Sequence, residues 1–336
     1  MNPTIKDVAK RANVSIATVS RVLNNLGGYS ENTREKVMQV IRETGYRPNA
    51  VARGLINKRT RTIGVLFPRV SSFFSSGILQ GIEEYAHIHD YSIMICNTGG
   101  DGNRTLKVLE LLQEKQVDGV IFCSSALRTE YVEIMAGMRV PVVLVSSESS
   151  YANIPFVRID NYTAAFEAVE YLIGKGHRNI AMIGGRQEDQ LAGVPRLEGY
   201  LGALRKHHIP VDERRIIYGD FRYESGYKGF EALLESARDM TAIFAASDEM
   251  ALGALSAAYK HGIRVPDDIS VIGFDGLELS RMAVPPLTTV RQPLVEMGSL
   301  AFELILEMIE TGEIPEQANI VHHSIVERDS VRTVED

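Results

Sequence analysis

The stretch TIKDVAKRANVSIATVSRVLN, residues 4–24, predicts two short helices joined by a tight turn. Thr4 is suited to cap the first helix, and apolar residues then follow at helical spacing until Asn13-Val14 interrupts them. Ser15 is suited to cap the second helix. The inward face of that helix carries Val19, Val22 and Leu23. Two short helices joined in this way have the outline of a helix-turn-helix.

A third helix is predicted between Ser30, which can cap it, and Gly45, which ends it. Its inward residues are Val37, Val40 and Ile41. We therefore expect residues 1–46 to form a helix-turn-helix DNA-binding domain. A generic three-helix bundle with polar outer faces is the alternative.

The second helix of such a unit places its N-terminal part in the major groove of DNA. Ile16, Ala17 and Arg21 are then the residues expected at base edges, because arginine bonds guanine bidentately and methyl groups contact thymine. Other polar side chains of the head are suited to phosphates. These are Thr4, Ser15, Thr18, Ser20, Asn24, Asn25 and Arg34.

Charge is distributed unevenly along the chain. Residues 1–61 hold 12 Lys and Arg against 4 Asp and Glu, a net charge of +8. Since the whole chain carries −7, residues 62–336 carry −15. A small cationic segment joined to a large anionic one is typical of a nucleic-acid-binding module attached to a domain with another task.

The length of 336 residues suggests two or three domains, and 45% hydrophobic residues are enough for a large core. No apolar run approaches the roughly 20 residues that span a bilayer, and the polar N-terminus does not resemble a signal peptide. Cys96 and Cys123 each end an apolar run, which indicates core residues in a reducing compartment. We expect a cytoplasmic protein without cofactor or metal.

From Thr62 onward, short apolar runs alternate with amphipathic stretches. The predicted strands are 63–67, 92–96, 119–123, 142–145, 180–183, 216–218, 242–246 and 269–274. Helices are predicted at 104–115, 164–175, 196–207 and 249–261, among others. Such alternation predicts an α/β fold with parallel sheets, here in two Rossmann-like lobes that divide near Asp160-Asn161.

The head and the segment after it resemble a known family. The motifs are Thr4–Ala9, Val14-Ser15, Thr18–Asn24 and the run GYRPNAVARGL at 45–55. Together they resemble the LacI/GalR transcriptional repressors, and the run RPNAVARGL is most similar to that of catabolite control protein-like members. The resemblance extends through most of the chain.

The segment 47–61 is expected to be a hinge helix and linker. Pro48 disfavours helix before it, and the short stretch from Ala50 to Ile56 is marginal as an isolated helix, so composition alone favours a plain basic linker. The resemblance instead implies a helix that folds in the minor groove, where Leu55 wedges between base steps. The implied minor-groove residues are Asn49, Ala52, Arg53 and Leu55.

For residues 62–336 the resemblance implies a periplasmic-binding-protein-like effector-binding and dimerisation domain whose chain crosses between lobes three times. The N-lobe would span about 62–161 and 291–322, and the C-lobe about 162–290 and 323–336. Ligands of open α/β sheets bind beyond the carboxyl ends of strands, which places the effector in the cleft. The cleft candidates are Phe73, Phe74, Ser75, Ser147, Asp160, Arg196, Phe221, Ser247, Asp248 and Asp275.

Three of these candidates gain a role from the resemblance: Arg196 matches the family's effector-binding arginine, Asp275 an effector-contacting acid, and Phe221 an aromatic wall. The alternatives are that Asp248 and Asp275 cap the next helices, and that Arg196 is a surface charge at a helix start. The chain departs from the family after its first strand, where Arg69 replaces an acid and Ser72-Phe73 replaces an Asn-Pro pair.

The sequence thus predicts a homodimeric regulator, a repressor of a pseudopalindromic operator, with a sugar or sugar phosphate as effector. The phosphocarrier protein HPr is the alternative regulator, implied by the likeness to catabolite control proteins. The amphipathic stretch Val295–Met308 is suited to packing against the sheet or a second subunit. A sugar-binding protein without a DNA role would leave the basic head unexplained. Nucleophile-elbow, P-loop and dinucleotide motifs do not occur in the sequence, so we expect no enzyme.

Overall fold

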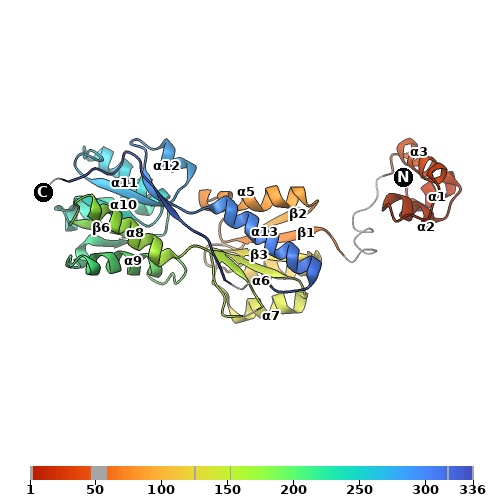
Figure 1. The fold of residues 1–336 in the computed structure, drawn as a ribbon, viewed down its shortest axis with the longest axis horizontal. Coiled ribbons are helices and arrows are strands. Elements are labelled where there is room, and N and C mark those ends of the chain that lie inside the picture. Colours follow the sequence, from red (N-terminus) through yellow and green to blue (C-terminus); the bar gives the residue numbers. More distant parts are fainter. Residues whose placement is uncertain (1–2, 47–58, 125, 152, 316–317, 335–336) are drawn as a thin grey trace. The chain divides into compact units, whose positions relative to one another are not determined.

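The chain divides by its internal contacts into two units, Met1–Arg61 and Thr62–Asp336 (Figure 1). A computed structural model describes residues 3–46, 59–124, 126–151, 153–315 and 318–334. The predicted hinge residues Asn49, Ala52, Arg53 and Leu55 lie outside the described residues. Each unit is therefore described by itself.

The first unit contains three helices that start at the predicted caps. They are α1 (Ile5–Ala12), α2 (Ile16–Leu23) and α3 (Glu31–Thr44). The hydroxyls of Thr4, Ser15 and Ser30 each accept a hydrogen bond from a backbone N–H in the first helical turn. Val8, Val19 and Val37 are fully buried where the three helices meet. The predicted helix-turn-helix is confirmed.

The second unit contains two six-stranded sheets, one in each lobe. The first sheet has the order β11-β5-β4-β3-β1-β2 and the second the order β12-β10-β9-β8-β6-β7. Neighbouring strands are parallel except β10 and β12. The strands of the first sheet are β1 (Thr62–Phe67), β2 (Ser92–Asn97), β3 (Gly119–Cys123), β4 (Val142–Val145), β5 (Phe156–Arg158) and β11 (Ala318–Ile320). Those of the second are β6 (Ile180–Gly184), β7 (Ile216–Tyr218), β8 (Ala242–Ala245), β9 (Ser270–Asp275), β10 (Thr288–Arg291) and β12 (Ser324–Val326).

Helices cover both sheets. In the first lobe, α5 and α13 lie on one side of the sheet and α6 and α7 on the other (Figure 1). In the second lobe, α8 packs against α9, and α10 packs against α11. The helices are α5 (Phe73–Ile88), α6 (Thr105–Glu114), α7 (Thr129–Met138), α8 (Asn161–Gly174), α9 (Gly193–Lys206), α10 (Tyr223–Ser236), α11 (Asp248–Lys260), α12 (Glu278–Met282) and α13 (Leu294–Thr311), with a 3-10 turn at Glu213–Arg215. The predicted two-lobed α/β fold class is confirmed.

The chain passes between the sheets three times: after β5, after β10 and between β11 and β12. Four strands next to these crossings, β5, β10, β11 and β12, were absent from the sequence-based prediction. They contain only three or four residues each, and FVR, TTVR, ANI and SIV form no long apolar run. Their positions come from pairing with longer strands, which a local pattern does not reveal.

Helix α13 packs within its own body, since it contacts α5 and strands β3, β4 and β5. Its apolar face, predicted at Val295–Met308, therefore belongs to the core of the first lobe. Glycines allow a close approach to α5: a Cβ atom on Gly298 would overlap the carbonyl oxygen of Ile78, and one on Gly81 would overlap that of Val295. Within the described residues no helix is both long and apolar enough to cross a membrane.

Gly298→Ala should lower the free energy of unfolding by about 1–3 kcal/mol, because the new methyl group must push α13 away from α5. Gly137→Ala is the matched control, since an added Cβ at that exposed position of α7 meets no neighbour and alanine favours helix. Denaturant unfolding measures both. Equal stability of the two variants would contradict the close packing.

Candidate functional site

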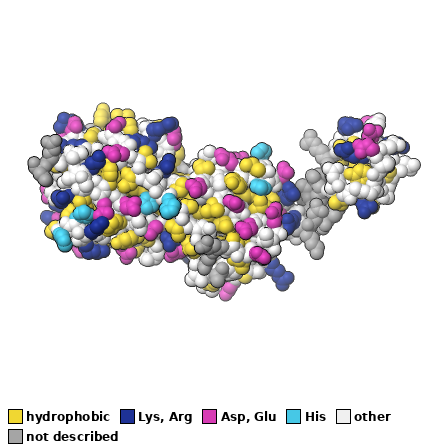
Figure 2. All heavy atoms as spheres, in the orientation of Figure 1, with side chains coloured by type: hydrophobic (Ala, Val, Ile, Leu, Met, Phe, Trp, Pro, Cys, Tyr) yellow, Lys and Arg dark blue, Asp and Glu magenta, His cyan; other side chains and the backbone are white. Residues whose placement is uncertain are grey.

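The exposed surface of α2 carries the residues predicted to read bases. Ile16, Ala17 and Arg21 are all exposed, and Ile16 keeps 44% of its surface accessible. An apolar side chain left in solvent at a helix start contributes nothing to the small core beneath it. Figure 2 shows the head with both basic and acidic side chains on the face drawn.

The residues predicted to contact phosphates mostly have roles within the head. Thr4 forms a reciprocal capping box with Asp7, and its hydrogen bonds lower the pKa of that carboxyl. Ser15 caps α2, with its hydroxyl 2.9 Å from that of Thr18. Residues Ser20 and Asn24 hydrogen-bond each other, Asn25 accepts from Tyr29, and Arg34 pairs with Glu31 at 2.9 Å. These contacts orient the helix ends, and the phosphate contacts themselves stay predictions.

Arg196 is the centre of the polar cluster in the second lobe. It lies in the first turns of α9 and is only 5% exposed, so its interpretation as a surface charge is wrong. Its Nε donates to Asn161 Oδ1 at 2.9 Å, and Nη1 donates to the Ala246 carbonyl at 2.6 Å. The guanidinium lies 3.7 Å from the ring centroid of Phe274. Hydrogen bonds and a ring face thus replace the water that this cation loses on burial.

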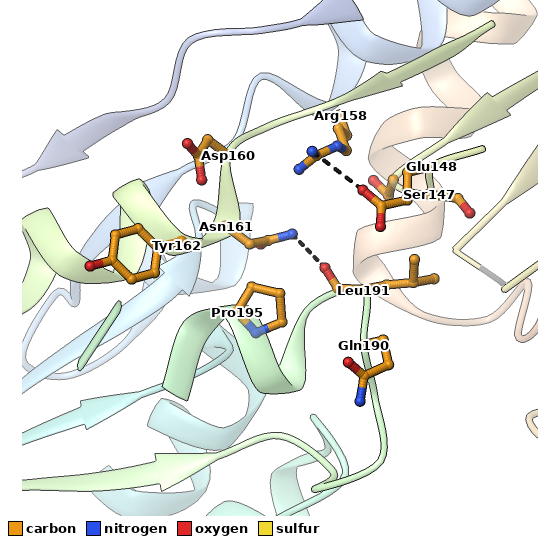
Figure 3. A pocket seen from close by; sticks show the side chains of 10 residues that line it. Ser147, Glu148, Arg158, Asp160, Asn161, Tyr162, Gln190, Leu191 and Pro195 are labelled. Carbon is orange, nitrogen blue, oxygen red and sulfur yellow. Dashed lines mark hydrogen bonds and ion pairs between the residues drawn. The ribbon is translucent and has the colours of Figure 1, made fainter. Parts of the chain in front are cut away.

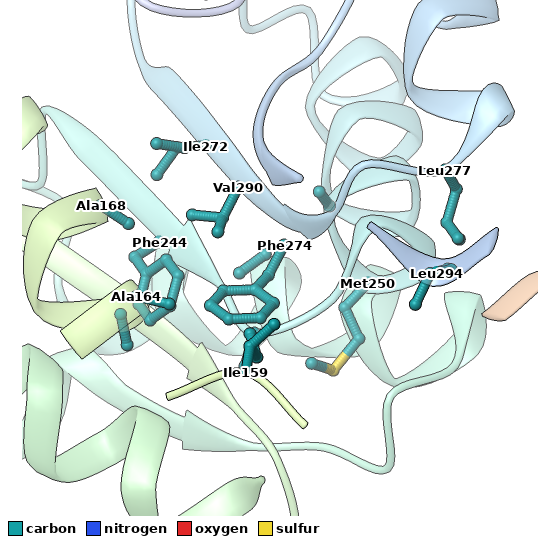
Figure 4. Close-up of a cluster of buried hydrophobic side chains, with 14 of the residues drawn as sticks. Ile159, Ala164, Ala168, Phe244, Met250, Ile272, Phe274, Leu277, Val290 and Leu294 are labelled. Carbon is teal, nitrogen blue, oxygen red and sulfur yellow. The ribbon is translucent and has the colours of Figure 1, made fainter. Parts of the chain in front are cut away.

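Asp275 supplies the nearby negative charge. It ends β9 with a φ of 120°, and its Oδ1 lies 3.7 Å from Arg196 Nη1. Gln292 Nε2 donates to the same oxygen at 2.8 Å. Burial raises the pKa of Asp275 to about 6, although the Arg196 charge acts to lower it. The ring of Phe274 extends into the core beside Phe244 (Figure 4).

Asp248 holds three elements together. Its carboxylate accepts from the Leu277 backbone N–H at 2.7 Å and from the Thr289 hydroxyl at 2.5 Å. Burial, with Asp275 close by, raises its pKa well above the usual value. Ser247, not Asp248, caps α11, and Asp275 caps no helix, so the capping interpretation of both acids is wrong.

Phe221 completes this cluster. Its φ is 65°, and its ring lies 5.7 Å from the Arg196 guanidinium. A Cβ on Gly185 would overlap that ring, so the glycine makes space for it. Ser247 Oγ donates to the Phe221 carbonyl at 3.2 Å. Five predicted residues, namely Arg196, Phe221, Ser247, Asp248 and Asp275, are therefore brought together in the second lobe.

The predicted residues near the first strand form the start of α5. Ser75 is buried and donates to the Arg69 carbonyl at 2.8 Å, Phe74 packs on the core, and Phe73 is 52% exposed. Arg69 itself pairs with Glu249 of α11, with 3.7 Å between Nη2 and Oε1. The residue that departs from the family pattern thus joins the two lobes.

A pocket of about 220 Å³ lies between the lobes near the first crossing (Figure 3). Of the predicted residues, Ser147 and Asp160 line it. Asp160 caps α8; burial acts to raise its pKa, but hydrogen bonds from Thr163 and the Arg158 charge outweigh this and lower it. The pocket lining is Ser146, Ser147, Glu148, Arg158, Asp160, Asn161, Tyr162, Gln190, Leu191 and Pro195.

The cleft candidates predicted from the sequence do not include Glu148, Arg158, Asn161 or Gln190, which line this pocket. Glu148 comes shortly after β4, so the expectation that ligands bind beyond the carboxyl ends of strands could have indicated it. Gln190 comes six residues after β6, and no local sequence pattern indicates it. Arg158 Nη2 lies 3.3 Å from Glu148 Oε2. Among the described groups, Arg158 Nε and Ser146 Oγ are buried without a hydrogen-bond partner. Buried polar atoms normally have a partner, so these two suit a bound polar molecule or water.

The unfolding free energy should depend on pH through Asp275. Because burial raises its pKa from the usual value of 3.8 to about 6, its neutral form stabilises the folded state below pH 4. That contribution is lost as the pH rises through about 6. Asp275→Asn cannot ionise and should not show this loss of stability. The unfolding free energy of the wild type should therefore fall by about 3 kcal/mol relative to that of the variant between pH 4 and pH 7. Urea unfolding at four pH values measures it; a constant difference would contradict the raised pKa.

Residues 4–49 match the family model of bacterial regulatory proteins of the lacI family, and residues 169–331 match a periplasmic binding protein-like domain. The chain is 42% identical to catabolite control protein A of Priestia megaterium over 99% of its own length and all of that relative. A lac repressor dimer bound to operator and the anti-inducer ONPF superimposes with a TM-score of 0.88, at 28% identity and over 99% and 100% of the two chains. A complex of the regulator CelR with cellobiose gives a TM-score of 0.74, at 32% identity and over 98% and 99%. The chain therefore belongs to the LacI family of DNA-binding transcription regulators.

Proposed function

We propose that the chain is a cytoplasmic, homodimeric repressor that binds a pseudopalindromic operator and responds to a small polar effector in its interlobe cleft. The observation that carries the operator proposal is the exposed set Ile16, Ala17 and Arg21 on the second helix of a fully capped helix-turn-helix. One small head binds weakly, and two heads joined in a dimer gain affinity through effective concentration. The proposal assigns the chain no catalysis.

Phosphate attraction would come from the rest of the head. Its net charge of +8 favours salt-dependent binding to any duplex, with Thr4, Ser15 and Arg34 among the proposed contacts. The hinge residues Asn49, Ala52, Arg53 and Leu55 are proposed to enter the minor groove at the operator centre, with Leu55 as the wedge.

An uncharged sugar is the effector class that we favour. The pocket offers carboxylates, amides and hydroxyls to a polyol. Its lining contains two carboxylates, Glu148 and Asp160, and one cation, Arg158, so a phosphate group would meet more negative than positive charge. Solved relatives at 28–32% identity include a complex with cellobiose and one with bound ribose. Their ligands support a sugar here without fixing which one.

The alternative regulator is the phosphocarrier protein HPr, which we retain because of the similarity to catabolite control protein A. It would act on the outer surface of the body and would leave the cleft pocket without a role. The two proposals therefore differ in whether pocket substitutions change the response.

Selection of duplexes from a random pool, followed by gel shifts, tests this function. The protein should enrich a pseudopalindromic sequence, and one member of a panel of sugars and sugar phosphates should change its operator affinity at least tenfold. Phosphorylated HPr is the parallel arm. Enrichment of no duplex would refute the operator proposal, and a response to HPr but to no sugar would refute the cleft effector.

Arg21→Ala should reduce discrimination at one base pair of each half-site by about 1–3 kcal/mol, because a bidentate guanine contact is lost. Arg34→Ala is the control: it removes a proposed phosphate contact, and so should weaken binding uniformly and reduce the salt dependence. Competition gel shifts with single-base operator variants measure both. A uniform loss for Arg21→Ala would make it a phosphate contact instead.

A further inference from the structure

Asn161 occupies a junction in the body. It is the first residue of α8, directly after Asp160, and so lies where the chain first crosses from one lobe to the other. It also lines the interlobe pocket (Figure 3). A displacement of Asn161 would therefore act at the point where the chain crosses between the lobes.

The two ends of its side-chain amide bond different elements. Oδ1 accepts from Arg196 Nε at 2.9 Å, and Nδ2 donates to the Leu191 carbonyl at 2.9 Å. The first bond reaches the buried arginine of α9, and the second reaches the loop that contributes Gln190 and Leu191 to the pocket (Figure 3). A planar amide is the neutral side-chain group that offers an acceptor and a donor at this spacing.

Both partners of Asn161 are held firmly on their far sides. Arg196 is fixed by the Ala246 carbonyl and the Phe274 ring. The loop is fixed by Asp189, whose carboxylate accepts from the backbone N–H groups of Leu191, Ala192 and Gly193 at 3.0–3.4 Å. Because other contacts hold both partners in place, a displacement of Leu191 should shift the Asn161 side chain, and with it Arg196 and the start of α8.

We propose that Asn161 is a positioning residue that couples the pocket loop to the buried arginine and to the interlobe crossing. A molecule that contacts Gln190 or Leu191 then changes the arrangement of the lobes without touching Arg196. This rests on the proposed cleft effector only for the identity of that molecule. The coupling itself belongs to the ligand-free protein.

Asn161→Asp separates the two bonds. The carboxylate keeps an acceptor for Arg196 Nε but has no donor for the Leu191 carbonyl. Asn179→Asp is the matched control, because Asn179 Oδ1 likewise accepts from an arginine, Arg215 Nη1 at 3.0 Å, and Asn179 does not line the pocket. Both variants are made in the full chain and compared without ligand.

Two readouts are taken. Amide hydrogen exchange in 189–193 should accelerate by about 2- to 10-fold in Asn161→Asp, as expected for loss of one hydrogen bond, while exchange in the buried part of α9 stays unchanged. Affinity for an operator duplex selected with the wild-type protein should shift at least threefold. Asn179→Asp should leave both readouts at wild-type values.

Unchanged loop exchange in Asn161→Asp would overturn the proposal. Faster loop exchange together with wild-type operator affinity would also overturn it, since the Asn161–Leu191 hydrogen bond would then stabilise only the loop. If the wild-type protein selects no duplex, the operator proposal fails separately, and the exchange comparison still decides whether Asn161 holds the loop. If the affinity shifts as expected but no sugar alters it, only the effector proposal fails.

Discussion

A guanidinium removed from water must be compensated, because an unpaired charge in a protein interior costs several kcal/mol. Arg196 imposes this requirement on the centre of the body. Three groups from different elements compensate this cation: the Asp275 carboxylate at the end of β9, the Ala246 carbonyl, and Asn161 Oδ1 at the start of α8. The second lobe is thus organised around one buried cation, and the pocket lies where one of its partners, Asn161, reaches the lobe boundary.

Charge also separates the tasks of the two units. The head is a small core of apolar side chains under a surface with net charge +8, whereas the body carries −15 and a far larger core. A duplex attracts the first and repels the second. On the face of the body shown in Figure 2, acidic and basic side chains are interspersed, so the acidic excess forms no single dominant patch there. Binding and sensing are therefore assigned to different segments by electrostatics as well as by fold.

Local signals in the sequence predicted much of this structure. Thr4, Ser15 and Ser30 begin helices as expected, and the long apolar strands alternate with helices in two lobes. The short strands β5, β10, β11 and β12 were not predicted, because they are defined by pairing partners far along the chain. The site was predicted only in part, because its contacts also join residues that lie far apart in the sequence. Strand ends indicated Arg196, Asp248 and Asp275, but their mutual compensation depends on how the elements of the second lobe pack. The placement of Gln190, Glu148 and Arg158 around one pocket depends on how the two lobes meet.

The central claim is that Arg196 and Asp275 stabilise the body as a compensated pair, and a double-mutant cycle tests it most directly. Unfolding free energies would be measured at pH 7 for the wild type, Arg196→Met, Asp275→Asn and the double variant. Arg196→Met should destabilise the body, because it leaves the Asp275 carboxylate without its cation, and the double variant should be more stable than the sum of the two single effects predicts by about 2 kcal/mol. Additive losses, with no coupling between the two positions, would contradict the claim.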